Sequence, residues 1–138
     1  MNTEPIVIER TFKATAGRVW QAITETDQLN EWFYRQPDFK AEVGFEFRIG
    51  GGGKDKHLCR IMEIEPGKKL VFSFENIGFP GTSTVAYELF DEGEQTRFRL
   101  THYNLDTLQP NTPGYGRTDF NGGWGYFAGK LQEFVERA

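Results

Sequence analysis

His102 has the side chain in this sequence that is best suited to acid–base chemistry. It lies near the end of Gln95 to Tyr103, where Phe98, Leu100 and His102 alternate with charged or polar residues. This spacing predicts a β-strand with one buried face, so we expect the imidazole to face inward beside a loop rich in Pro and Gly. Two interpretations are open: a general base or ligand contact at a cavity mouth, and a structural residue that caps backbone groups of the following loop.

Glu63 is a second candidate, because strand alternation places it on one face with Cys59 and Ile61. A buried carboxylate has to be paired, hydrogen-bonded or protonated. We therefore expect Glu63 to point inward and to form a structural salt bridge, for example with Arg48. His57 lies next to a run of glycines and is expected to be in water.

Neither a metal centre nor a catalytic triad is predicted. A single cysteine and two histidines are too few for zinc, which needs four ligands, or three and a water. No serine follows the nucleophile-elbow pattern, and no pair of carboxylates is placed for acid–base work. Residues 50–53 are all glycine but lack the Lys-Ser/Thr ending of a phosphate-binding loop, so they predict a turn. No cofactor is expected, and an enzyme is left open without being indicated.

The segment from Asp119 to Arg137 must position these side chains. Its apolar residues recur three or four positions apart, which predicts a helix with one buried stripe. They are Phe120, Trp124, Phe127, Leu131, Phe134 and Val135. Asp119 is the expected N-cap, as Thr15 and Asp27 are for two shorter helices upstream. Each glycine in the long helix costs about 1 kcal/mol relative to Ala, so the helix needs a partner to pack against.

Strands are the partner that the sequence offers. Ile6 to Phe12 alternates as a first strand, and helical spacing follows at Ala14 to Thr24 and at about Asp27 to Phe33. From Ala41 to Tyr103 the period is two, with turns that indicate an antiparallel meander. We predict an α+β fold in which a curved antiparallel sheet wraps on a long C-terminal helix, with two short helices after the first strand. A single domain over residues 1–138 is expected, with a long loop at Asn104 to Thr118.

A cavity between the sheet and the C-terminal helix is the expected binding site. Aromatic side chains at these spacings usually form core, and they become ligand contacts only where a cavity stays open. Tyr115 and Arg117, in the long loop, either gate such a cavity, hold the acidic end of a ligand or lie on plain surface. The predicted cavity candidates are Trp20, Trp32, Glu63, Phe74, Tyr87, Leu100, His102, Tyr115, Trp124 and Phe127.

Composition narrows the classes of partner and location. The 138 residues carry a net charge of −4 without a basic stripe, so nucleic acid is not expected as a partner. The single cysteine indicates a reducing compartment. Neither a signal peptide nor an apolar stretch of membrane-spanning length is recognisable. We therefore expect a cytoplasmic protein, and the oligomeric state is left open.

Several short motifs occur in a set order between residues 6 and 136. They are Glu9 to Ala14, Val19 to Ile23, Glu31 to Phe33, Glu63 to Pro66 with Leu70 to Phe72, Thr96 to His102, and Gly123-Trp124 with Leu131. In order and spacing the chain resembles the START-like helix-grip domains, also called the SRPBCC superfamily. The branch that it most resembles is named for the C-terminal domain of the activator of the heat-shock-protein-90 ATPase.

This resemblance implies a helix-grip fold, as in the birch-pollen allergen, in a superfamily whose members bind lipids, polyketides or other apolar small molecules. It leaves three functions open. The first is a binding domain without catalysis that encloses a small apolar or aromatic ligand. The others are a protein-interaction domain acting on a chaperone ATPase and a cyclase- or hydrolase-type enzyme with His102 as base. Arg60, where Gly is common, and Phe120-Asn121, where a His often stands, depart from the family pattern, so no specific activity is carried over.

Overall fold

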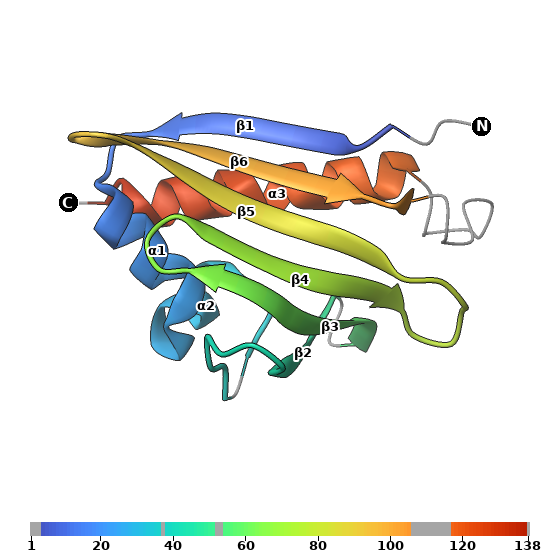
Figure 1. The fold of residues 1–138 in the computed structure, drawn as a ribbon. Helices are drawn as coiled ribbons and strands as arrows, with labels where there is room; N and C mark the ends of the chain where they lie inside the picture. The colour runs from blue at the N-terminus through green and yellow to red at the C-terminus, as the bar shows by residue number, and fades with distance from the viewer. Residues whose placement is uncertain (1–3, 37, 52–53, 106–116, 138) are drawn as a thin grey trace.

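The computed structural model describes residues 4–36, 38–51, 54–105 and 117–137, and in it helices cover one face of an antiparallel sheet (Figure 1). The elements in chain order are β1 (Ile6–Phe12), α1 (Ala16–Thr24), α2 (Thr26–Trp32), β2 (Glu46–Gly51), β3 (Lys54–Glu65), β4 (Lys69–Asn76), β5 (Ser83–Glu92), β6 (Gln95–Tyr103) and α3 (Arg117–Val135). The six strands lie in the order β1-β6-β5-β4-β3-β2, and all neighbours are antiparallel. The predicted α+β helix-grip architecture is confirmed.

Two of the three predicted helix caps are wrong. Thr15 does cap α1, since its hydroxyl oxygen accepts a hydrogen bond from the Arg18 N–H at 3.3 Å. Glu25 both ends α1 and precedes α2, because its N–H donates to Gln21 O while its own carbonyl accepts from Leu29 N. Asp27 therefore lies inside the first turn of α2. Asp119 likewise lies in the first turn of α3, where a carboxylate still suits the positive end of the helix dipole.

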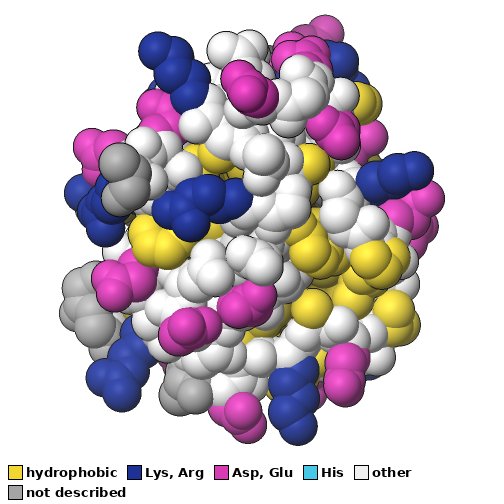
Figure 2. Space-filling model, turned by 90° about the vertical axis from the view of Figure 1, so that its left-hand side faces the viewer, with side chains coloured by type: hydrophobic (Ala, Val, Ile, Leu, Met, Phe, Trp, Pro, Cys, Tyr) yellow, Lys and Arg dark blue, Asp and Glu magenta, His cyan; other side chains and the backbone are white. Residues whose placement is uncertain are grey.

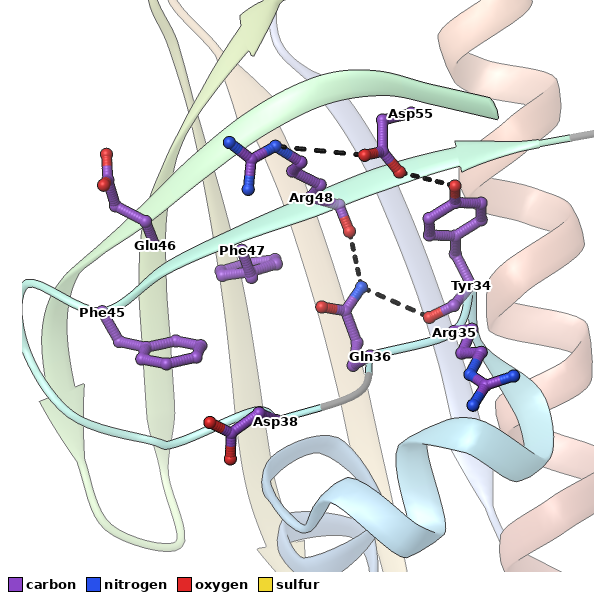
Figure 3. A pocket seen from close by; sticks show the side chains of 9 residues that line it. All are labelled: Tyr34, Arg35, Gln36, Asp38, Phe45, Glu46, Phe47, Arg48 and Asp55. Carbon is purple, nitrogen blue, oxygen red and sulfur yellow. Dashed lines mark hydrogen bonds and ion pairs between the residues drawn. The ribbon is translucent and has the colours of Figure 1, made fainter. Parts of the chain in front are cut away.

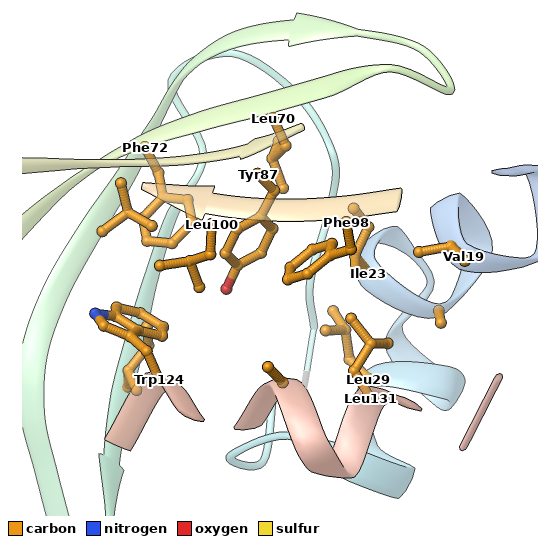
Figure 4. Close-up of a cluster of buried hydrophobic side chains, with 14 of the residues drawn as sticks. Val19, Ile23, Leu29, Leu70, Phe72, Tyr87, Phe98, Leu100, Trp124 and Leu131 are labelled. Atoms are coloured by element: carbon orange, nitrogen blue, oxygen red, sulfur yellow. The ribbon is translucent and has the colours of Figure 1, made fainter. Parts of the chain in front are cut away.

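The core lies between the concave face of the sheet and α3. Trp124 and Leu131 are 3% and 1% exposed, and Figure 4 shows both pointing from α3 towards side chains of the sheet. Burying an apolar side chain of this size contributes roughly 1.5–3 kcal/mol. Packing on the sheet thus offsets the low intrinsic helix propensity of the glycine-containing segment.

Side chains leave almost no space between the sheet and the two short helices α1 and α2. A void of about 10 Å³ is left among residues that include Ile23, Phe72 and Tyr87. A water molecule needs at least about 10–15 Å³. A ligand therefore has no room where α1 and α2 pack on the sheet.

Glu63 points away from the core, so the predicted inward orientation is wrong. The register of β3 against β4 shifts between Ile61 and Glu63, which marks a β-bulge. The extra residue of a bulge interrupts the alternation of side chains, so Ile61 is buried while Glu63 is exposed. Its carboxylate pairs with Lys69 Nζ at 3.0 Å, and the suggested partner Arg48 instead lies 4.0 Å from Asp55.

Arg18 holds the C-terminal end of α3. Its Nε donates to the Val135 carbonyl at 2.7 Å and its Nη2 to the Phe134 carbonyl at 3.0 Å. Carbonyls in a last helical turn have no intrahelical donor, and hydrogen bonds from a charged group contribute about 1.5–3 kcal/mol. We expect Arg18→Ala to lower the free energy of unfolding by about 2 kcal/mol in urea denaturation. Arg18→Lys keeps the positive charge but cannot donate to both carbonyls as the guanidinium does, so it should retain about half or less of the stabilisation that Arg18 provides. An unchanged denaturation midpoint for Arg18→Ala would contradict this assignment.

The glycines of α3 are not required by packing. A Cβ built on Gly122 or Gly129 meets no other atom within 4 Å, and an Ala in a helix interior is favoured over Gly by roughly 0.5–1 kcal/mol. Gly122→Ala and Gly129→Ala are therefore each expected to raise the melting temperature measured by circular dichroism. A lower melting temperature in either variant would show that the glycine has a structural role.

No helix within the described residues is long and apolar enough to cross a membrane. Figure 2 looks onto the end of the molecule that carries α1 and the C-terminal end of α3, and there acidic and basic side chains are interspersed around hydrophobic ones. The described residues on this face form no stripe of one charge.

Candidate functional site

His102 is completely buried and joins three elements of the fold. The Trp124 indole N–H on α3 donates to His102 Nδ1 at 3.0 Å. Because an indole nitrogen can only donate, Nδ1 is the acceptor and the proton lies on Nε2. Nε2 then donates to Ser83 Oγ at 2.8 Å, and the Ser83 hydroxyl donates to the Phe74 carbonyl at 2.9 Å.

This geometry gives His102 a structural role. Burial, with a smaller contribution from the charge of His57, lowers the pKa of His102 to about 3, so the ring is neutral near pH 7. Both nitrogens are occupied by protein partners. The general-base interpretation finds no support in this arrangement. The structural interpretation fits, although the partners are Ser83 and Trp124 and not backbone groups of the following loop.

Open space exists at the end of the sheet–helix interface where α3 begins. There a groove of about 320 Å³, which we call the α3 groove, separates the first half of α3 from β2, β3 and β4. It is lined by Ile49, Gly50, Lys56, His57, Phe74, Asp119, Phe120, Gly123, Trp124 and Phe127. Of the predicted cavity candidates, Phe74, Trp124 and Phe127 line it.

Aromatic rings form the walls of the α3 groove. Phe74 lies at its centre, with ring centroids 5.6 Å from both Phe120 and Trp124. The His57 imidazole stacks on Phe74 at 4.3 Å and 28°. Edge-to-face and stacked arrangements at these distances are the favourable ones for aromatic pairs. The groove can therefore accept a flat apolar group through the same contacts that its own rings make.

His57 is half-buried in this wall, so the expectation of a histidine in water is wrong. Its Nδ1 lies 3.0 Å from Asn76 Oδ1. Burial lowers the pKa of His57 to about 4, with the nearby Lys56 acting in the same direction and the Asn76 hydrogen bond opposing it. At neutral pH the groove thus contains a polar but uncharged ring, and the exposed Lys56 ammonium lies at its rim.

The remaining predicted candidates do not reach the α3 groove. Trp32 donates its indole N–H to the Ala22 carbonyl at 2.8 Å and belongs to the core, against which the half-buried Trp20 packs. Tyr87 and Leu100 are buried in the central core, where Figure 4 shows them above α3. Glu63 lies on the surface. Tyr115 lies outside the described residues, as does the side chain of Arg117.

Several residues that line the groove were not among the predicted candidates, including Ile49, Lys56, His57 and Phe120. Period-two spacing on β2 and β3 does signal an inward face for Ile49 and His57. Only the register of β2 on β3, with Ile49 opposite His57, brings that face to the beginning of α3.

The comparisons with known proteins agree with this architecture. The family model described as Activator of Hsp90 ATPase homolog 1-like protein matches residues 13–136. No curated protein matches the chain in sequence.

Three solved structures illustrate how closely the fold is shared. DynU16, from the dynemicin biosynthetic locus, is 21% identical with a TM-score of 0.81, and the match covers 98% of this chain but 48% of DynU16. MLL2253 from Mesorhizobium loti is 23% identical, with a TM-score of 0.77 and 98% of both chains covered. The Aha1 dimer from Colwellia psychrerythraea is 20% identical, with a TM-score of 0.76 and 96% of both chains covered. At these identities the likeness establishes the fold.

Proposed function

Since this chain belongs to the family described as Activator of Hsp90 ATPase homolog 1-like protein, we propose that it is a cytosolic START-like domain that binds a small aromatic or apolar ligand in the α3 groove. The observation that carries this proposal is an open groove of about 320 Å³ with aromatic walls where α3 begins, whereas only about 10 Å³ is left where α1 and α2 pack on the sheet. Natural ligand sites are mostly apolar hollows of roughly 300–1,000 Å³ with a few polar groups.

The lining indicates the chemistry of the ligand. Phe74, Phe120 and Trp124 form an apolar wall of the groove, and each exposes at most 7% of its surface. The uncharged His57 suits a hydroxyl or carbonyl group of the ligand, because a neutral imidazole carries one donor and one acceptor. The exposed Lys56 and Asp119 both line the groove and carry opposite charges, so the lining favours a ligand whose polar end is neutral. A small aromatic molecule with one oxygen substituent therefore fits the groove best.

Binding without catalysis is the form of this function that the geometry supports. The buried His102 uses both ring nitrogens for contacts within the protein. Within the described residues, no group of three or more His, Cys, Asp or Glu side chains lies close enough to hold a metal ion. Among the described residues that line the groove, His57 is the one titratable ring, and a pKa of about 4 makes it a weak base.

Two neighbouring glycines provide a matched test of ligand binding. Gly123 lines the α3 groove whereas Gly122 does not, and an added Cβ at either position meets no atom within 4 Å. With 2-naphthol as probe, we expect saturable binding to the wild-type protein in a fluorescence titration. Gly123→Leu should weaken binding by about tenfold or more by filling the groove, and Gly122→Leu should bind like the wild type. No binding to the wild type, or equal effects of the two substitutions, would contradict the proposal.

The family description favours a second candidate function, in which the chain acts on a chaperone ATPase. An ATPase assay with a heat-shock-protein-90 chaperone, with and without this protein, tests it directly. A rate increase that persists in Gly123→Leu would assign the effect to a surface other than the α3 groove. An unchanged rate at saturating protein would exclude the second candidate for that chaperone.

A further inference from the structure

A second hollow lies outside the sheet–helix interface, on the far side of the edge strand β2. Its volume is about 450 Å³, and it is bounded by β2 and by the segment that follows α2 (Figure 3). We call it the β2 hollow. Its lining shares no residue with the α3 groove, so the two sites can be tested independently.

Gln36 directs an unused acceptor into the β2 hollow. Its side chain is 4% exposed, and Nε2 donates to the carbonyls of Tyr34 and Arg48. Carbonyl oxygens only accept, so these two bonds fix which end of the amide is the NH₂. Figure 3 shows Oε1 turned the other way, towards Phe45 and Phe47. Among the described residues none donates a hydrogen bond to Oε1.

Most charges around the β2 hollow are already compensated. Asp55 accepts a hydrogen bond from the Tyr34 hydroxyl at 2.6 Å and lies 4.0 Å from Arg48. Glu46 pairs with Arg60 at 3.0 Å. In Figure 3 the Arg35 guanidinium points away from the two phenylalanine rings. The paired groups Asp55, Arg48 and Glu46 therefore do not decide which charge a ligand in the hollow should carry.

Two charged side chains of the lining form no ion pair within the described part of the chain, namely Arg35, which points away from the two rings in Figure 3, and Asp38. The Asp38 carboxylate is exposed and lies beside Phe45 in Figure 3. The hollow thus presents a carboxylate, the amide oxygen of Gln36 and two phenylalanine rings. Oxygen acceptors and ring faces both attract cations, and an anion would meet only repulsion from this set.

We propose that the β2 hollow binds an organic ammonium group carried on a short apolar stem. The ammonium donates to the Asp38 carboxylate and to Gln36 Oε1, and the stem packs on Phe45 and Phe47. A free amine and a lysine side chain share this chemistry. The two sources differ in the stem, because only an aryl or branched stem covers both rings.

Amide-shift titrations by NMR test the proposal. The probes are 2-phenylethylamine, its neutral analogue 2-phenylethanol, its anionic analogue phenylacetate, and N-acetyl-lysine methylamide. We expect saturable binding of 2-phenylethylamine, with shifts at the Gln36 side-chain NH₂ and at the amides of Asp38, Phe45 and Phe47. The neutral 2-phenylethanol and the anionic phenylacetate should each bind at least about fivefold more weakly than 2-phenylethylamine. Tighter binding of the lysine derivative than of 2-phenylethylamine would identify a lysine side chain as the ligand source.

Asp38→Asn is the decisive variant, and Glu42→Gln is its control. Glu42 is exposed and lies in the same segment between α2 and β2, but it does not line the hollow. Asp38 is exposed, so its substitution leaves the fold intact. We expect Asp38→Asn to weaken amine binding by about fivefold and Glu42→Gln to leave it unchanged. Equal binding of the three phenyl probes, unaltered binding in Asp38→Asn, or no binding of either amine would overturn the proposal.

Discussion

His102→Ala is expected to lower the free energy of unfolding by about 3–5 kcal/mol. Removal of a fully buried imidazole leaves a cavity, and it also leaves the Trp124 N–H without its acceptor and Ser83 without its donor. Cavity formation on truncation to Ala costs about 2–5 kcal/mol, and an unsatisfied buried polar group costs about 1–3 kcal/mol. Urea denaturation followed by tryptophan fluorescence measures the difference.

Thr101→Ala is the control for this prediction, because Thr101 is the neighbouring residue on the other face of β6 and is only half-buried. We expect a change within about 0.5 kcal/mol for it. Trp124→Phe keeps the aromatic packing but removes the N–H donor, and should cost about 1–2 kcal/mol. A His102→Ala protein as stable as the wild type would show that the hydrogen-bonded chain from Trp124 to Phe74 does not hold the fold.

Loss of stability in mild acid is the second large expected effect. The pKa values of His57 and His102 are about 4 and about 3 in the folded protein, against about 6.5 for an unfolded histidine. Between these values the unfolded chain binds more protons than the folded one, so stability is full above pH 6.5 and falls as the pH drops. From pH 5.5 to pH 4.5 the two rings together should remove about 2–3 kcal/mol.

Urea denaturation at those two pH values measures this loss, and His57→Gln separates the two histidines. That variant removes one of the groups, so it should lose about half as much stability over the same interval. Carboxylates such as Glu9, whose pKa is lowered by its hydrogen bond to Arg99, begin to add to the loss near pH 4.5 and contribute most of their share below it, because an unfolded glutamate titrates at about 4.3. Stability that is equal at pH 5.5 and pH 4.5 would contradict the buried, neutral state of both rings.

The fold was predictable because its signals are local and repeated. Alternation in β1 and β6 and the three-to-four spacing of Trp124, Leu131 and Val135 each specify one buried face. A sheet and a helix with one apolar face each can be buried only against each other. The confirmed α+β architecture follows from these two facts together with the order of the elements.

The candidate site was predicted only in part, because it depends on the register between neighbouring strands and on how completely side chains fill the core. The bulge after Ile61 turns Glu63 outward, and no residue type in that stretch signals it. Whether Tyr87 meets a ligand or a neighbouring side chain depends on how completely the core is packed, and periodicity does not contain that information. His57 enters the α3 groove only because β2, β3 and the first turns of α3 meet at one end of the sheet.

Intermolecular NOEs test the central claim, that the α3 groove and not the centre of the molecule holds an aromatic ligand. With 2-naphthol bound at saturation, the account predicts NOEs from the naphthalene protons to the rings of Phe74, Phe120 and Trp124. It predicts none to Phe98 or Tyr87, which are buried in the core and do not line the groove. NOEs to the core rings, or contacts confined to residues outside the α3 groove, would contradict it.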